Sequence, residues 1–224
     1  YFTFSDIINN VNVTGTRGVG GFFGYLERTN IGIKISNLVS YANVVGIGVT
    51  GGIAGCAASS DEMNIVILNS SDHGNISATT GSAGVFFGTV SGGKKVFCNI
   101  SGCLNNGHIS GGSSVGGFIG AFDGNQNVNM TISGSINNGV VTGTNDVGGF
   151  IGRISGNGNI WVLFVDDHHN GTVTGNGQAS NIGGIVGIVQ INNNMIMQID
   201  GITNDGMLTN GISVGGIIGH FWNN

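Results

Sequence analysis

The sequence has no proline and very little charge. Charged residues make up 8% of its 224 positions, and the six Lys and Arg residues are scattered singly, apart from Lys94 and Lys95. A chain of this kind has no basic face for nucleic acid, so we expect no nucleic-acid partner. With so few charges, its surface must be covered largely by Asn, Ser, Thr and Gly.

Long apolar runs and a leader segment are missing as well. No run approaches the roughly 18 apolar residues that a membrane-spanning helix needs, so we expect no membrane span. The chain begins at Tyr1, with neither an initiator methionine nor a signal-peptide pattern. We therefore expect Tyr1 to be a mature or deliberately chosen N-terminus.

Glycine, by contrast, is abundant and regularly spaced. Residues 147–152 read Val-Gly-Gly-Phe-Ile-Gly, and close or looser copies end at glycines spaced 31 to 35 residues apart. These closing glycines are Gly24, Gly55, Gly88, Gly120, Gly152, Gly187 and Gly219. A fixed period in this range is typical of repeat proteins. Because 40% of the residues are hydrophobic, the spacing indicates a folded chain and not a disordered one.

Each repeat contains three segments that have strand character. Apolar and polar residues alternate around Met130 and Ile132, a short segment follows at 140–143, and the glycine-rich segment follows at 147–152. Asn138-Gly139 supplies a tight corner between the first two. The pattern predicts an all-β fold, a parallel β-solenoid (β-helix) of about seven coils of ~32 residues, with residues 1–224 forming a single repeat domain.

Asparagine recurs at one position of the repeat, in Asn9, Asn105, Asn137 and Asn204. Stacked asparagines can form an amide ladder that stabilises neighbouring strands. Asparagine also favours turns for local reasons. The sequence leaves both interpretations open.

Six N-glycosylation sequons occur, and all fall at positions that should face solvent. They are Asn12, Asn69, Asn75, Asn99, Asn129 and Asn170. Each precedes an inward residue or lies at a turn, so we expect all six to be accessible. Occupied sequons would identify a secreted eukaryotic protein that carries covalent N-glycans.

The repeat unit resembles the GLUG-type repeats of bacterial and protist surface proteins. The matching residues are Asn-Gly-Val-Val-Thr-Gly at 138–143 and Val-Gly-Gly-Phe-Ile-Gly at 147–152. The resemblance covers nearly the whole chain. It implies a large adhesive or stalk-like secreted protein with stacked β-solenoid coils, and it implies no active site.

The two ends of the sequence nearly complete a whole number of repeats. In the repeat alignment Asn224 matches Asn125 and Tyr1 matches Asn129, and neither end resembles a polar cap. We expect a head-to-tail homopolymer, with the sequence being a fragment of a longer array as the alternative. The expected self-assembly residues are Tyr1, Phe2, Phe4, Ile217, Ile218, Phe221 and Trp222.

No catalytic, cofactor or metal site is predicted. Residues 166–169 read Asp-Asp-His-His, which are metal-ligand types, but adjacent residues on a strand point in different directions and turn polarity explains them better. Asp61 and Glu62 suggest half of an acid–base pair, but the other acidic residues are dispersed. We therefore expect no enzyme activity and no cofactor.

Three cysteines leave at least one unpaired. The repeat alignment places Cys98 in an inward column with Met130. It places Cys56 on the outside and Cys103 at a corner. A Cys56–Cys103 disulfide, or an intermolecular bond from either thiol, is left open.

Together these features favour a secreted structural protein, a subunit of a glycosylated extracellular fibre, coat or stalk at the cell surface. The alternative is a segment of a larger adhesin that binds glycans or a host surface. A carbohydrate-active β-helix enzyme is the third interpretation.

Overall fold

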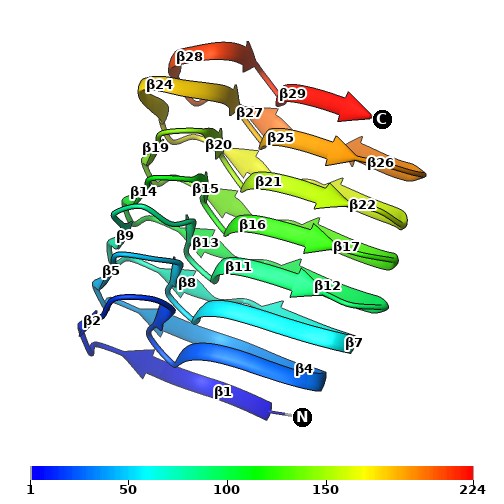
Figure 1. The fold of residues 1–224 in the computed structure, drawn as a ribbon. Helices are drawn as coiled ribbons and strands as arrows, with labels where there is room; N and C mark the ends of the chain where they lie inside the picture. The colour runs from blue at the N-terminus through cyan, green and yellow to red at the C-terminus, as the bar shows by residue number, and fades with distance from the viewer. Residues whose placement is uncertain (1, 224) are drawn as a thin grey trace.

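The computed structural model describes residues 2–223, except for the side chains of 177–180, and every regular element in that part is a β-strand. The chain winds into stacked coils that rise from the N-terminus at one end to the C-terminus at the other (Figure 1). All strand pairs between neighbouring coils are parallel. The predicted all-β solenoid of about seven coils is confirmed.

The strands form two parallel sheets (Figure 1). The 17-stranded sheet contains β1 (Phe2–Asn9), β4 (Phe23–Ser40), β7 (Ala54–Leu68), β8 (Ser71–Asp72), β11 (Phe87–Gly92), β12 (Lys95–Ser101), β13 (Leu104–Asn105), β16 (Ile119–Gly124), β17 (Asn127–Ser133), β18 (Ile136–Asn137), β21 (Ile151–Gly156), β22 (Asn159–Val165), β23 (His168–His169), β25 (Val186–Ile191), β26 (Met195–Asp200), β27 (Thr203–Asn204) and β29 (Ile218–Asn223). The 12-stranded sheet contains β2 (Val13–Thr14), β3 (Val19–Gly20), β5 (Val44–Gly46), β6 (Thr50–Gly51), β9 (Ile76–Ala78), β10 (Ala83–Gly84), β14 (Ile109–Gly111), β15 (Ser114–Gly116), β19 (Val141–Gly143), β20 (Asp146–Gly148), β24 (Val173–Gly183) and β28 (Leu208–Gly215).

The register stacks equivalent residues of successive coils in columns. Cys98, for example, pairs with Met130, and Met130 pairs with Val162, as the inward column of the sequence required. The closing glycines fall in one column, because Phe87 pairs with Ile119 immediately before Gly88 and Gly120. The columns follow directly from the repeat spacing in the sequence.

The glycine-rich segment was wrongly predicted to be a single strand. Residues 146–148 belong to β20 and residues 151–156 belong to β21, so the chain turns from one sheet to the other between them. A Cβ on Gly148 would overlap the carbonyl oxygen of Ile151, because the bend brings the backbone back toward itself. As a result a regular coil such as 119–148 contains five strands (β16 to β20), not three.

A second corner places one residue per coil in the left-handed backbone region. The φ angle at this column lies between 48° and 63°, which Asn, Asp and Gly tolerate best. Its occupants are Asp6, Asn37, Asn69, Gly102, Gly134, Asp166 and Gly201. From β7 onward the 17-stranded sheet turns sharply here, between a long and a two-residue strand, whereas Asp6 and Asn37 lie within β1 and β4.

The core lies inside the coils and is built from columns of aliphatic and aromatic residues. Phe86, Phe118 and Phe150 stack one above another, with ring centroids 5.2 Å and 4.9 Å apart. All three are essentially inaccessible to solvent. Phe118 and Phe150 pack edge-to-face, which adds about 1 kcal/mol to the burial of their rings, and Phe86 and Phe118 are tilted.

Part of the amide ladder that the sequence left open is formed. The Nδ2 of Asn105 donates to the Oδ1 of Asn137 at 2.8 Å, and both residues are buried. Each Oδ1 also accepts the backbone N–H two residues later, from Gly107 at 2.8 Å and from Gly139 at 3.0 Å. Ser40, Asp72 and His169 occupy the same column in other coils, so the ladder is interrupted on both sides.

Replacing Asn137 with Ala should lower the free energy of unfolding by about 3 kcal/mol, because the Gly139 N–H and the Asn105 amide lose a buried partner. Chemical denaturation followed by circular dichroism measures this loss. The matched control is Asn138→Ala, which removes the exposed ladder contacts to Asn106 and Asn170 and should cost less than about 1 kcal/mol. Equal losses in the two variants would show that the buried amide has no special role.

Candidate functional site

The six sequon asparagines all lie on the outside of the coils. Five are exposed and Asn99 is half-buried, with Val66 and Thr131 as its neighbours in the adjoining coils. The exposed sequon residues are Asn12, Asn69, Asn75, Asn129 and Asn170. Five of the side chains are therefore exposed enough to carry a glycan, and the half-buried position of Asn99 restricts the sixth.

Three of the sequons, Asn12, Asn75 and Asn170, lie where the chain passes from the 17-stranded sheet to the 12-stranded sheet, and Asn69 lies at the nearby left-handed corner. Asn12 and Asn75 share a column, in which Asn12 Oδ1 accepts the N–H of Asn43 at 2.8 Å and Asn75 Oδ1 accepts that of His108 at 3.2 Å. Both contacts use the carbonyl oxygen, not the amide nitrogen that carries an N-glycan. Asn69 occupies the left-handed corner, and Asn170 donates to Asn138 in an outer amide row at 2.9 Å.

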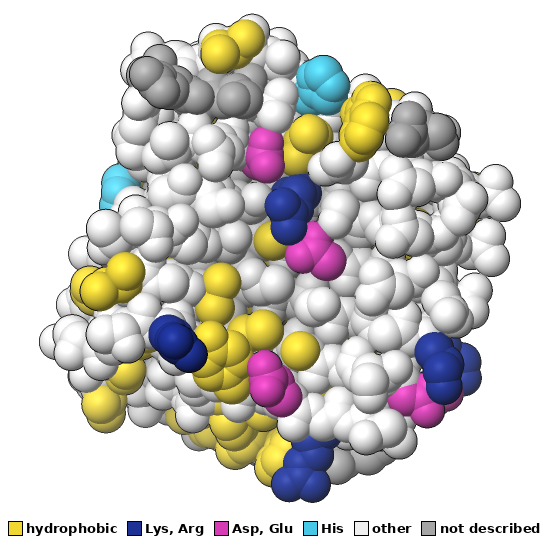
Figure 2. Space-filling model, viewed as in Figure 1, with side chains coloured by type: hydrophobic (Ala, Val, Ile, Leu, Met, Phe, Trp, Pro, Cys, Tyr) yellow, Lys and Arg dark blue, Asp and Glu magenta, His cyan; other side chains and the backbone are white. Residues whose placement is uncertain are grey.

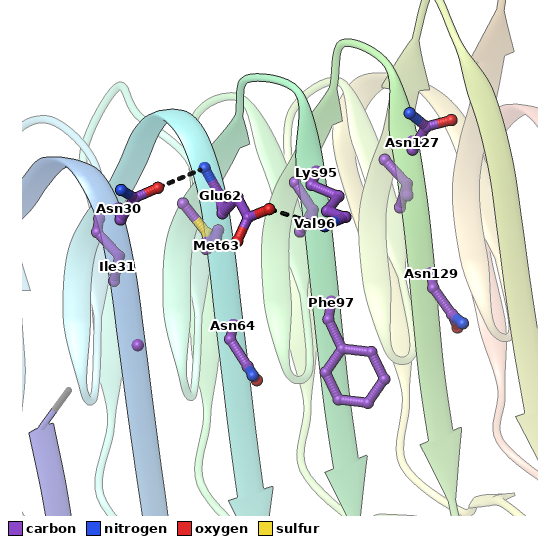
Figure 3. Close-up of a pocket in the computed structure, with 12 residues that line it drawn as sticks. Asn30, Ile31, Glu62, Met63, Asn64, Lys95, Val96, Phe97, Asn127 and Asn129 are labelled. Atoms are coloured by element: carbon purple, nitrogen blue, oxygen red, sulfur yellow. Dashed lines mark hydrogen bonds and ion pairs between the residues drawn. The ribbon is translucent and has the colours of Figure 1, made fainter.

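Asn129 lies in a different setting, a groove on the outer face of the long strands. Figure 3 shows Asn64, Phe97 and Asn129 at the same level of β7, β12 and β17. The groove has a volume of about 530 Å³. Phe97 is 42% exposed, and Trp161, which follows Asn129 in the column, is 50% exposed.

A second, separate hollow of about 520 Å³ lies nearer the C-terminus and is lined by the equivalent residues of the next two coils, including Trp161 and Ile196. In the groove beside Asn129, Glu62 and Lys95 form an ion pair at 2.7 Å. Hydrogen bonding to Glu62 raises the pKa of Lys95. The groove is thus lined by amide, charged and aromatic side chains together with buried apolar residues of the long strands.

The Asp-Asp-His-His segment divides between the two sides of the strand, as predicted. Asp167 and His169 are buried, whereas Asp166 is exposed and His168 is half-buried. The backbone N–H of Ser135 donates to Asp167 at 2.8 Å, and neither ring nitrogen of His169 has a hydrogen-bond partner in the described structure. The four residues therefore do not converge on one site.

Asp61 and Glu62 pair with the lysines of the next coil. The Nζ of Lys94 lies 3.2 Å from Asp61, and that of Lys95 lies 2.7 Å from Glu62. Within residues 2–223, no group of three or more His, Cys, Asp or Glu side chains is arranged to hold a metal ion. The two carboxylates thus act as partners in exposed ion pairs.

All three cysteines are free thiols, so the Cys56–Cys103 disulfide that the sequence left open is not formed. Cys103 is 1% exposed at the corner, and this burial also removes it from contact with another chain. Burial raises the pKa of Cys103 to about 11 and that of Cys98 to about 12. Cys56 faces outward and is half-buried, with a pKa raised first by burial and then by Glu27.

The remaining candidate residues lie at the two end coils, residues 2–28 and 195–223. Phe2 is 43% exposed, Phe221 56% and Trp222 42%, while Phe4, Ile217 and Ile218 are half-buried. Tyr1 lies outside the described residues. Apolar side chains gather over the lower end of the molecule, where the N-terminal coil lies, and charged side chains are scattered (Figure 2).

The chain matches no protein-family model, no curated protein and no solved structure. Among the described residues, no helix is long and apolar enough to cross a membrane.

Sequence reasoning missed three features of these sites. The groove around Asn129 was not predicted, although Phe97 and Trp161 stood in one outward column. The left-handed corner was not recognised, although its column contains only Asp, Asn and Gly. The burial of Asp167 and His169 was not anticipated either.

Proposed function

We propose that this protein is a secreted, N-glycosylated structural solenoid that assembles head to tail into a fibre, coat or stalk. The observation that carries the proposal is the apolar stacking face at each end coil. Columns that are buried in the middle coils are only partly buried at the ends. These end residues are Phe4, Ile7, Val13, Phe22, Phe23, Met195, Met197, Ile199, Ile202, Leu208, Ile217 and Ile218.

The two end faces are complementary when one copy is placed on another. The columns bring Phe2 over Met197, Phe4 over Ile199 and Phe23 over Ile218, as the register runs through the intervening coils. Each contact would continue an inward column with another apolar side chain. Stacking would bury apolar surface at roughly 25 cal/mol per Å² and would supply hydrogen-bond partners to two unpaired strand edges.

The polarity of the sheets sets the geometry of assembly. Because every pair is parallel, the face of 195–223 matches the face of 2–28 and does not match itself. Such a contact is heterologous, and repetition of it produces a filament instead of a closed dimer. The resemblance to GLUG-type surface repeats and the outward sequons support an extracellular setting, in which glycans would keep a weakly charged fibre soluble.

Electron microscopy of the secreted protein tests the proposal directly. We expect smooth filaments with an axial repeat of roughly 34 Å, the height of seven coils at about 4.8 Å each. Discrete rods of one short length at high protein concentration would contradict self-assembly, and rods projecting from a larger body would favour an adhesin segment.

A pair of point variants tests whether the end face drives the assembly. Phe4→Glu places a carboxylate in the stacking face, beside the rings of Phe22 and Phe23, and should abolish filaments. Thr3→Glu adds the same charge to the exposed outer side of β1 and should leave filaments intact. Circular dichroism must show the same β-sheet content in both. Filaments of normal length from Phe4→Glu would refute the stacking interface.

A further inference from the structure

The groove described above ends at a sequon, Asn129, which the strand register places between two exposed aromatic side chains, Phe97 in the groove and Trp161 in the next hollow. We propose that the N-glycan on Asn129 binds in this groove, and that the first sugar of the glycan packs between Phe97 and Trp161. This inference rests on the proposed function, because it requires the protein to be glycosylated. It assigns one sequon a defined glycan conformation and makes that glycan part of the solenoid surface.

Register places the three side chains next to one another. Asn129 pairs with Phe97 of the preceding coil and with Trp161 of the following coil, and all three face outward. Neighbouring strands are about 4.8 Å apart, so a sugar attached to Asn129 Nδ2 begins between the two rings. Same-face neighbours at this spacing contact each other directly.

The chemistry of the groove suits an N-acetylglucosamine unit. One face of a pyranose ring carries mainly C–H bonds and packs against aromatic rings, which bury a large apolar area. The hydroxyl and acetamido groups at the sugar's edge need hydrogen-bond partners, and the amides of Asn64 and Asn127 line the same groove. Its volume of about 530 Å³ lies within the usual range of about 300–1,000 Å³ for ligand sites.

The neighbouring sequon lacks these features. Asn99 faces the same side of the sheet, but its column neighbours are Val66 and Thr131, and its side chain is half-buried. It therefore has neither a flanking aromatic pair nor full exposure. Asn129 has both, and a glycan on it would shield its aromatic neighbours from solvent.

The test uses the full chain secreted from a eukaryotic cell, with Trp222→Phe so that Trp161 is the single tryptophan. In this background, Thr131→Ala destroys the Asn129 sequon without changing Asn129, and Thr131→Ser keeps the sequon as the matched control. Glycopeptide mass spectrometry reports occupancy at each site. Acrylamide quenching of fluorescence reports the exposure of Trp161.

We expect a glycan on Asn129 in the Thr131→Ser protein and stronger quenching of Trp161 in the Thr131→Ala protein, with a red shift of its emission. A glycan on Asn129 with equal quenching in both proteins would overturn the proposal. An unmodified Asn129 in a protein whose other sequons are occupied would overturn it as well, while leaving the glycoprotein function intact. A secreted protein with no occupied sequon would overturn both.

Discussion

Gly148→Ala is expected to prevent the solenoid from folding normally, through the addition of a single methyl group. A Cβ at this position would overlap the carbonyl oxygen of Ile151 and come 2.7 Å from the amide nitrogen of Gly187. Both obstacles are backbone atoms, one in the same coil and one in the next, so no side-chain rotation relieves them. We expect a loss of about 3 kcal/mol or more, at the upper end for overpacked cores.

The same obstacle recurs in every coil, which explains why this column contains only glycine. In each coil, a Cβ would meet the carbonyl oxygen three residues later. The column consists of Gly20, Gly51, Gly84, Gly116, Gly148, Gly183 and Gly215. The requirement arises from the bend between the two sheets and not from any ligand.

Gly134→Ala provides the matched control. A Cβ there would meet nothing within 4 Å, but φ is +56°, so the cost should be only about 1 kcal/mol. Denaturant midpoints and soluble yields of the two variants, measured under the same conditions, make the comparison. Similar losses would mean that backbone conformation, and not close approach, explains the glycine columns.

Much of the fold could be predicted because its determinants repeat in the sequence. The closing glycines and the alternation around Met130 recur once per coil, and stacked coils convert that recurrence into columns. The division of 147–152 between two sheets could not be read in the same way. The bend depends on where the Ile151 carbonyl packs, and a carbonyl is present in every residue.

The candidate sites were less predictable, for a related reason. Exposure of most sequons followed from strand alternation, but the groove around Asn129 depends on which side chains stand in the neighbouring coils. For Asp167 and His169, polarity suggested a solvent-facing turn, whereas their columns, which hold Ser135 and Asn137, are buried. Column position therefore decides burial here more reliably than residue type.

The buried ionisable residues lead to the second large expected effect, a fold that is more stable in mild acid than at alkaline pH. Burial raises the pKa of Asp72 to about 7 from 3.8, with contacts to Ser40 and Gly74 offsetting part of the shift. Burial likewise raises the pKa of Asp167 to about 7 from 3.8, and the hydrogen bond from the Ser135 N–H offsets part of this shift. Burial lowers the pKa of His169 to about 4 from 6.5.

The sign of this pH dependence follows from whether the folded or the unfolded state binds more protons. Each aspartate is protonated more readily in the folded state, so its stabilisation is complete below about pH 3.8 and is lost as the pH rises to about 7. His169 acts in the opposite direction: its contribution is complete above pH 6.5 and is lost as the pH falls toward 4. Two aspartates outweigh one histidine, so stability should fall with rising pH across this window.

The net effect is large relative to the stability of a typical domain. When the folded state binds one more proton than the unfolded state, the free energy of unfolding falls by about 1.4 kcal/mol per pH unit. The free energy of unfolding should therefore be about 3 kcal/mol higher at pH 5 than at pH 7.5. The ion pairs of Lys94 and Lys95 are exposed, and screening by solvent makes such pairs weak, so they do not reverse this trend. Urea denaturation at a series of pH values, at constant ionic strength, measures the slope.

The double variant Asp72→Asn, Asp167→Asn should reverse the sign of that slope. Asparagine keeps the shape and the acceptor oxygen of each side chain, and Asn105 already fills the Asp72 column in the next coil. With both carboxyl groups gone, His169 becomes the dominant buried titrating group, and stability should rise from pH 4 to pH 6.5.

A variant that keeps the wild-type slope would show that the two carboxyl groups are ionised in the folded protein. In that case their charge would have to be compensated inside the coils. A reversed slope, with higher stability than the wild type at pH 8, would show that these two buried acids cost the solenoid stability at alkaline pH.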